Sequence, residues 1–157
     1  MNSIGQLFSP SDVLLDLEVP SKQALFDAVS HLWAESRGMV AVDVEKSLNA
    51  RESLGSTGVG RGVAIPHARI KGLAEAVAAF VRPATPIAFD SPDGVPVSYC
   101  FVLLVPEAAT EQHLQILADV VGMLSDEQFR TQLANAKSQQ DIHQLFSTWY
   151  DPNANCD

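Results

Sequence analysis

The sequence predicts an α/β fold: a single domain in which a mixed, mostly buried β-sheet is flanked by helices. Three observations predict it. Apolar residues recur at helical spacing before residue 55, in strand-like runs between 62 and 106, and at helical spacing again after 110. No repeat, linker or low-complexity segment interrupts this order of helices, strands and helices. We expect one domain over residues 1–157, with its core at about 8–147 and a frayed tail at 151–157.

Two helices are expected first. In "VPSKQALFDAVSHLWAES", at 19–36, Ser21 stands in position to cap the helix. Its apolar stripe is made of Leu25, Ala28, Val29, Leu32 and Trp33. The segment "DVEKSLNARESLG", at 43–55, predicts a second helix that is capped by Asp43 and ends near Gly55.

The periodicity then becomes that of strands. "GVAI" at 62–65 and "AEAVAAFV" at 74–81 are expected to be strands, the second apolar enough for burial on both faces. Pro, Asp and Gly punctuate 86–97, which favours a short β excursion or hairpin. "VSYCFVLLVP" at 97–106 is the strongest strand pattern, and we expect it to be central.

Three helices complete the chain. Thr110 can cap the first, at 111–125, and Ser125 begins "SDEQ", which has the form of a capping box. Ser138 begins a weaker version of that box, "SQQD". The apolar residues at helical spacing in 111–125 are Leu114, Leu117, Val121 and Leu124.

Composition excludes several classes of function. The longest purely apolar run, Tyr99–Val105, has seven residues, whereas a membrane span needs roughly 20. The N-terminal residues lack the basic and apolar regions of a signal peptide. Cys100 lies in the apolar run and Cys156 in the polar tail, so we expect a buried thiol, no disulfide, and a location in the reducing cytoplasm.

The net charge is unevenly distributed. A value of −9 for the whole chain disfavours nucleic acid, whose phosphates require a basic surface. Between Arg51 and Lys71, however, four cations accompany one carboxylate, which gives this segment +3 and the rest of the chain −12. The uneven distribution is explained either by chance or by a local anion site on an acidic protein.

The segment "LGSTGVGRGVAIPHARI", at 54–70, contains four of the nine glycines within eight residues and places His67 directly after Pro66. It is no Walker A loop, because Arg61 and Gly62 stand where Lys and Ser or Thr are required. The Rossmann spacing and the G-x-S-x-G hydrolase motif fail as well. No H-E-x-x-H or paired C-x-x-C motif indicates zinc, so we expect neither a metal nor a cofactor, although distant histidines and a carboxylate leave a zinc site as a minor alternative.

The same residues suit a histidine that carries a phosphoryl group. An imidazole must be neutral to attack phosphorus, and one with the ordinary pKa of about 6.5 is largely neutral at cytoplasmic pH. A glycine-rich turn offers backbone N–H groups to phosphoryl oxygens, here with Ser56, Thr57 and Gly58 as the phosphate-binding residues. Arg51 lies in the last turn of the second predicted helix. Its planar guanidinium can donate two parallel hydrogen bonds to phosphate oxygens.

Each histidine also has a simpler explanation. His67 can be a hydrogen-bonded surface residue that follows a strand. His113 stands at N3 of its helix if Thr110 is the cap, where it can face water, although a helix N-terminus also attracts anions. His31 and His143 lie on amphipathic helices, and we expect packing or surface roles for both.

The segment 54–70 closely resembles the active-site signature of the mannitol/fructose-type (type 2) enzyme IIA domains of the bacterial phosphoenolpyruvate-dependent phosphotransferase system. In that family the phosphohistidine lies in an "A-[IL]-P-H" element, matched here by residues 64–67. "TPIAFDSPDGVPVSYCFVLLVP" resembles the segment that follows in the nitrogen-regulatory members, and "EQHLQIL" resembles the helix of the family's second histidine. The similarity runs from about 19 to 146. One variation is Ala68, where relatives often carry Gly or Cys; a methyl group there should be tolerated.

The resemblance implies a mixed sheet flanked by helices, in agreement with the periodicity. It also implies a phosphotransferase component with a phosphohistidine intermediate, in which an HPr-type phosphocarrier donates a phosphoryl group to Nε2 of His67. His113 and Arg51 match the supporting histidine and arginine, and Ser56 and Thr57 match the Ser-Thr pair of the loop.

The resemblance is strongest to the nitrogen-regulatory branch, in which regulated proteins read the phosphorylation state. The segment "FDSPDGVPV" favours that branch, as does a chain without room for a second domain or a membrane segment. A free-standing fructose- or mannitol-type IIA that passes phosphate to a IIB partner during carbohydrate uptake is the first alternative. A non-covalent anion-binding module, in which His67 is never modified, is the second.

Overall fold

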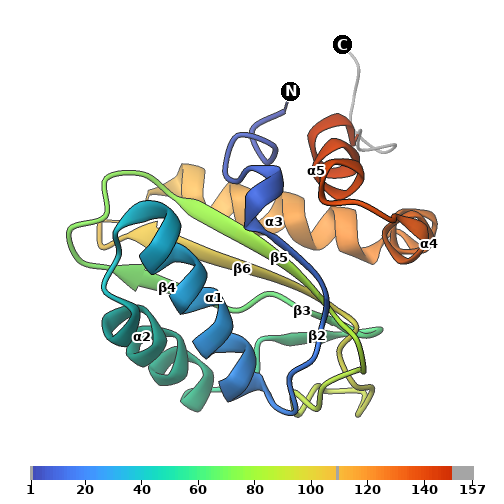
Figure 1. Ribbon diagram of the computed structural model, residues 1–157, viewed down its shortest axis with the longest axis horizontal. Coiled ribbons are helices and arrows are strands. Elements are labelled where there is room, and N and C mark those ends of the chain that lie inside the picture. Colours follow the sequence, from blue (N-terminus) through green and yellow to red (C-terminus); the bar gives the residue numbers. More distant parts are fainter. Residues whose placement is uncertain (1, 109, 150–157) are drawn as a thin grey trace.

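Two groups of helices enclose a β-sheet in the structure, a computed structural model that describes residues 2–108 and 110–149 (Figure 1). Helices α1 and α2 cover one face of the sheet, and α3, α4 and α5 cover the other. The helices span Lys22–Arg37 (α1), Ala41–Ser53 (α2), Glu111–Ser125 (α3), Glu127–Asn135 (α4) and Gln139–Thr148 (α5). The predicted fold class, a mixed sheet flanked by helices, is confirmed.

The sheet has the strand order β1-β5-β6-β3-β2, and β4 also pairs with β6. The strands span Val13–Leu17 (β1), Gly58–Gly60 (β2), Val63–Ala64 (β3), His67–Ile70 (β4), Val77–Pro83 (β5) and Tyr99–Pro106 (β6). β5 runs antiparallel to β6, whereas β3 and β4 run parallel to it and β1 runs parallel to β5. β6 therefore lies at the centre of the sheet, as predicted.

Side chains of β6 alternate between the two helical layers, as strand geometry requires. Phe101 and Leu103 pack with residues of α3, α4 and α5, whereas Cys100 and Val102 pack with residues of α1 and α2.

Burial, with a smaller contribution from the charge of Glu52, raises the pKa of the Cys100 thiol far above its ordinary value. Cys100 is thus the buried thiol that was expected; Cys156 and the predicted frayed tail lie outside the described residues.

β3 and β4 form one strand that is interrupted at Ile65 and Pro66. β3 pairs with the first residues of β6, and β4 begins with His67 opposite Leu103. Pro66 has no N–H to donate, but its carbonyl accepts a hydrogen bond from the Leu103 N–H at 2.9 Å. The strand predicted at 62–65 is therefore shorter than expected and resumes beyond the proline. β1, β2 and β4 were not predicted.

Two of the predicted helix starts are wrong. α2 begins at Ala41 with Val40 as its N-cap, so Asp43 lies in the first turn. There its negative charge stabilises the helix by interacting with the positive end of the helix dipole. α4 is capped by Asp126, which accepts from the Gln128 N–H at 3.0 Å, because Ser125 still belongs to α3. The predicted caps Ser21 and Ser138 are confirmed by side-chain bonds to the Ala24 and Asp141 N–H groups.

The glycine-rich segment folds into a hairpin of β2 and β3. Gly60, Arg61 and Gly62 have φ values of 93°, 59° and 78°, so the turn lies in the left-handed region that glycine adopts readily. Asp93 accepts hydrogen bonds from the Arg61 N–H at 2.8 Å and the Val95 N–H at 3.1 Å, which lower the pKa of its carboxyl. The 86–97 excursion, closed by a single bridge between Ile87 and Val97, thereby packs on the hairpin.

Close approach of this excursion explains why residue 58 is glycine. A Cβ at position 58 would lie 2.2 Å from Ser91 Oγ and 3.0 Å from Ser91 Cβ. Gly58→Ala is therefore expected to lower the free energy of unfolding by about 1–3 kcal/mol, the usual cost of overpacking. Urea denaturation measures the difference.

Gly122→Ala is the matched control for this substitution. Its Cβ would meet only Trp149, at an ordinary 3.9 Å, so alanine should match or exceed the stability of the wild type in the interior of α3. Equal stability of Gly58→Ala and the wild type would show that the excursion does not pack on the hairpin this closely.

Candidate functional site

His67 begins β4 and is half buried, with a defined hydrogen bond at one ring nitrogen. Its Nδ1 lies 2.9 Å from the carbonyl oxygen of Ile65. A carbonyl oxygen only accepts, so Nδ1 carries the proton and, in the neutral ring, Nε2 keeps its lone pair. Leu103 donates to the Pro66 carbonyl, so the backbone groups of Ile65 point away from β6, on the side where the imidazole two residues later reaches the Ile65 carbonyl.

His67 lies between two adjoining pockets, of about 510 Å³ and about 210 Å³. The larger is also lined by Arg51 and His113, and the smaller by Arg51, Ser56, Thr57 and Gly58. The structure thus gathers every predicted site residue around the imidazole, with Arg51 shared by both pockets. A further cavity of about 700 Å³, between α2 and residues 70–77, contains none of them.

His113 occupies the N3 position of α3, as expected for a helix capped at Thr110. The Thr110 N–H donates to His113 Nδ1 at 2.9 Å. A backbone N–H only donates, so this nitrogen is unprotonated and the proton of the neutral ring lies on Nε2. The two histidines therefore have opposite tautomers: Nε2 of His67 presents a lone pair, and Nε2 of His113 presents a donor.

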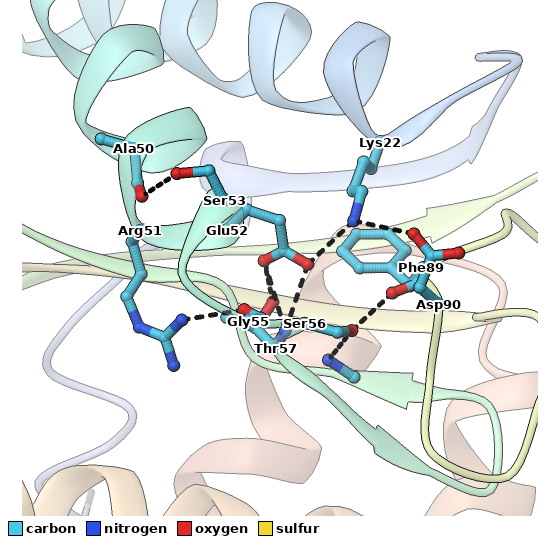
Figure 2. A network of polar contacts seen from close by, with 11 residues as sticks. Lys22, Ala50, Arg51, Glu52, Ser53, Gly55, Ser56, Thr57, Phe89 and Asp90 are labelled. Carbon is cyan, nitrogen blue, oxygen red and sulfur yellow. Dashed lines mark hydrogen bonds and ion pairs between the residues drawn. The ribbon is translucent and has the colours of Figure 1, made fainter.

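Arg51 lies in the last turn of α2 and is partly buried. Its Nη1 donates to the Gly55 carbonyl at 2.9 Å, which fixes the side chain beside the loop that follows the helix (Figure 2). A guanidinium has five N–H donors, so this contact leaves donors for an anion in the pockets.

Ser56, Thr57 and Gly58 line the smaller pocket, but their polar groups already have partners. The Ser56 hydroxyl donates to the Phe89 carbonyl and accepts from the Gly58 N–H at 3.0 Å. The Thr57 hydroxyl donates to Glu52 at 2.6 Å, and its N–H does so at 3.1 Å (Figure 2). Their expected role as phosphate-binding residues remains a prediction, and binding would require these donors to be shared or released.

Sequence reasoning missed Glu52, whose carboxylate is the acceptor in this network. Val44, Leu48 and Glu52 recur every four residues on the buried face of α2. A carboxylate in that series must find donors inside the protein, so the spacing could have indicated a buried, hydrogen-bonded Glu52.

The other two histidines behave as expected: His31 is exposed and bonded to its own helix, and His143 donates to the carbonyls of Gly5 and Phe8.

Exposed apolar side chains surround the pockets. Leu114 lines the larger pocket and is 65% exposed, and Val59 and Val121 line the smaller one at 49% and 39%. The apolar stripe predicted for α3 is thus only partly buried, because Leu124 packs in the core while Leu114 faces outward.

Comparison with known proteins identifies the family. Residues 6–149 match the family described as "Phosphoenolpyruvate-dependent sugar phosphotransferase system, EIIA 2". The chain belongs to the EIIA 2 family. This IIA protein is 38% identical over 146 residues to the nitrogen regulatory protein of Pseudomonas aeruginosa, with 92% of this chain and 95% of that protein covered.

Solved structures agree with this assignment. The nitrogen regulatory protein IIA-Ntr of Neisseria meningitidis superposes on this IIA protein with a TM-score of 0.87 at 43% identity, covering 92% and 99% of the two chains. Enzyme IIA-Mtl of Escherichia coli, solved in complex with phosphorylated enzyme IIB-Mtl, shares the fold with a TM-score of 0.74 at 15% identity, covering 91% and 100%.

Two kinds of structure are not found among the described residues: a cluster of metal ligands and a membrane-spanning helix. Among the described residues of this IIA protein, no three His, Cys, Asp or Glu side chains gather as ligands for a metal ion. Within the same residues, no helix combines the length and the apolar character needed to cross a bilayer.

The opposite tautomers of the two histidines can be tested directly. Long-range ¹H–¹⁵N correlation spectra, recorded above pH 8 where imidazoles are neutral, should show the proton of His67 on Nδ1 and that of His113 on Nε2. The exposed His31 of α1 provides an internal comparison. A proton on Nε2 of His67 would contradict the hydrogen bond to Ile65.

Proposed function

We propose that this protein accepts a phosphoryl group from an HPr-type phosphocarrier on Nε2 of His67 and acts as a regulator through its phosphorylation state. The observation that carries the proposal is the hydrogen bond from His67 Nδ1 to the Ile65 carbonyl. It holds the neutral ring as a nucleophile, with the Nε2 lone pair available in a pocket that Arg51 and His113 also line. We place the exchange in the cytoplasm, where a phosphocarrier would meet the protein.

The transfer requires one bond to form and one to break. The Nε2 lone pair attacks phosphorus, the bond between phosphorus and the donor breaks, and the donor keeps the electron pair. Positive charge then develops on the His67 ring, and the Ile65 carbonyl stabilises it through the Nδ1 proton. The loose transition state places negative charge on the phosphoryl oxygens, which the Arg51 guanidinium and the Nε2 proton of His113 are suited to stabilise.

We favour a regulatory role for the phosphorylated protein because its relatives include proteins named as nitrogen regulators. The Pseudomonas aeruginosa and Neisseria meningitidis proteins, both called nitrogen regulatory proteins, match almost the entire chain. A dianionic phosphoryl group on His67 would change the charge at the centre of the exposed apolar residues Val59, Leu114 and Val121. Regulated proteins that bind this surface would then distinguish the two states.

Labelling tests the proposed phosphorylation site. Incubation with phosphoenolpyruvate, enzyme I and the phosphocarrier should add a single acid-labile phosphoryl group to the wild type and to His31→Ala, and none to His67→Ala. Intact-protein mass spectrometry measures the label. Labelling of His67→Ala at the wild-type level would refute the site.

The same labelled protein separates the remaining alternatives. Rapid transfer of the label to a purified IIB protein would favour the sugar-transport role, of the kind suggested by the Escherichia coli IIA-Mtl complex with phosphorylated IIB-Mtl. Retention of the label on His67 would favour the regulatory role. Saturable phosphate binding without any covalent label would favour the anion-binding module.

His113→Ala tests the supporting histidine. It should slow phosphoryl transfer on the order of 100-fold, the usual cost of losing one preorganised donor to a charged transition state. The fold should survive, because the ring is only half buried and the Thr110 N–H can bond water instead. Rapid-quench kinetics with a circular dichroism spectrum as the folding control measure both; an unchanged transfer rate would remove His113 from the site.

A further inference from the structure

Glu52 is a buried carboxylate that no proposed chemical step uses. Its side chain is 5% exposed, yet it accepts from three donors: the Thr57 N–H at 3.1 Å, the Thr57 hydroxyl at 2.6 Å and Lys22 Nζ at 3.1 Å (Figure 2). Lys22 is itself only 15% exposed and lies 5.5 Å from the centre of the Phe89 ring. A buried charge is tolerated only with such complete pairing, so the arrangement is specific.

The contacts of Glu52 close the loop that follows α2. The chain leaves the helix after Ser53 and returns at Thr57, where both donors of one residue bind the carboxylate. Within the loop, the Gly55 N–H donates to the Glu52 carbonyl at 3.2 Å. The segment from 52 to 57 is therefore held at both ends by the same residue.

The loop in turn holds the side chain of Arg51. The Gly55 carbonyl, in the middle of the closed segment, accepts from Arg51 Nη1 at 2.9 Å. Figure 2 shows the guanidinium on the opposite side of the loop from the Glu52 carboxylate. Two further contacts hold the loop: the Gly55 N–H donates to the Glu52 backbone carbonyl, and the Ser56 hydroxyl donates to the Phe89 carbonyl. The bonds of Thr57 to the Glu52 carboxylate are the buried ones, so releasing them would loosen the return of the chain after Gly55.

We propose that Glu52 is a positioning residue: its bonds to Thr57 and Lys22 set the loop that aims the Arg51 guanidinium at the phosphoryl group on His67. This inference rests on the proposed function. Glu52 itself does not line the pockets around His67, so it acts through Arg51 and not by contact with phosphate.

Glu52→Gln is the test, because it keeps the size of the side chain and removes the charge. An amide has one acceptor oxygen in place of two, so it cannot serve Lys22 and both donors of Thr57. The phosphorylation rate at saturating phosphocarrier should fall about tenfold or more, since misplacing a catalytic group is costly. The phosphocarrier concentration that gives half the maximal rate should stay unchanged, because the Glu52 carboxylate is buried and does not line the pockets around His67.

A double-mutant cycle separates positioning from a general loss of stability. In an Arg51→Ala background the guanidinium is absent, so Glu52→Gln should change the rate by less than about twofold. An equal slowing in both backgrounds would overturn the inference, because the effect would then bypass Arg51. An unchanged rate of Glu52→Gln in the wild-type background would overturn it as well.

Asp12→Asn is the matched control. Asp12 is 1% exposed and bonded to Arg37 at 2.9 Å, so it is another buried, paired carboxylate, but it does not line the pockets around His67. It should lower the thermal unfolding temperature and leave the rate per folded molecule at the wild-type level. A slowing as large as that of Glu52→Gln would contradict a specific role of Glu52.

A further variant covers the case in which Glu52→Gln does not fold. Thr57→Val removes the hydroxyl that donates to Glu52; it should slow transfer in the wild-type background and change the rate by less than about twofold in the Arg51→Ala background. Equal slowing in both backgrounds, as a direct contact between Thr57 and phosphate would produce, would overturn the inference. Absence of label on the wild type would refute the proposed function and this inference together, whereas labelled wild type with unaffected variants would refute the inference alone.

Discussion

The hydrogen bond between His67 Nδ1 and the Ile65 carbonyl is the interaction on which the site depends. It exists because Leu103 donates to the Pro66 carbonyl, so that the backbone groups of Ile65 point away from β6: the Ile65 N–H donates to the Thr57 carbonyl, and the Ile65 carbonyl is available to the ring. In the described sheet β4 pairs with β6 alone, at an edge where a second protein can approach. The backbone thus sets both the tautomer of the imidazole and its accessibility.

The three layers of the fold converge at this edge. Arg51 comes from α2 on one face of the sheet, His113 from α3 on the other, and His67 from the sheet between them. Each helix is held by its own apolar cluster, so the guanidinium and the second imidazole are positioned independently. Preorganised donors of this kind need not reorient when charge develops, which is the main requirement of phosphoryl transfer.

Much of the fold could be predicted from the sequence, because β6 and α1 have strong local signals, and the Pro66–His67 pair was enough to single out His67 as the candidate. The start of α2 could not: Val40 has no capping side chain, yet its carbonyl accepts from the Asp43 and Val44 N–H groups at 3.1 Å and 3.2 Å, which starts the helix before Asp43. The glycines were expected to admit phosphate, but Gly58 has to admit Ser91. That contact joins residues far apart in the sequence, so no local pattern reveals it.

Finding which ring nitrogen of His67 the proposed phosphorylation uses tests the account most directly. Protein labelled with ¹⁵N in histidine and phosphorylated through the phosphocarrier should show coupling between phosphorus and Nε2 of His67, while the Nδ1 proton and its bond to Ile65 persist. Coupling of phosphorus to Nδ1 would contradict the account, because that nitrogen could accept phosphorus only by giving up the hydrogen bond on which the site is built.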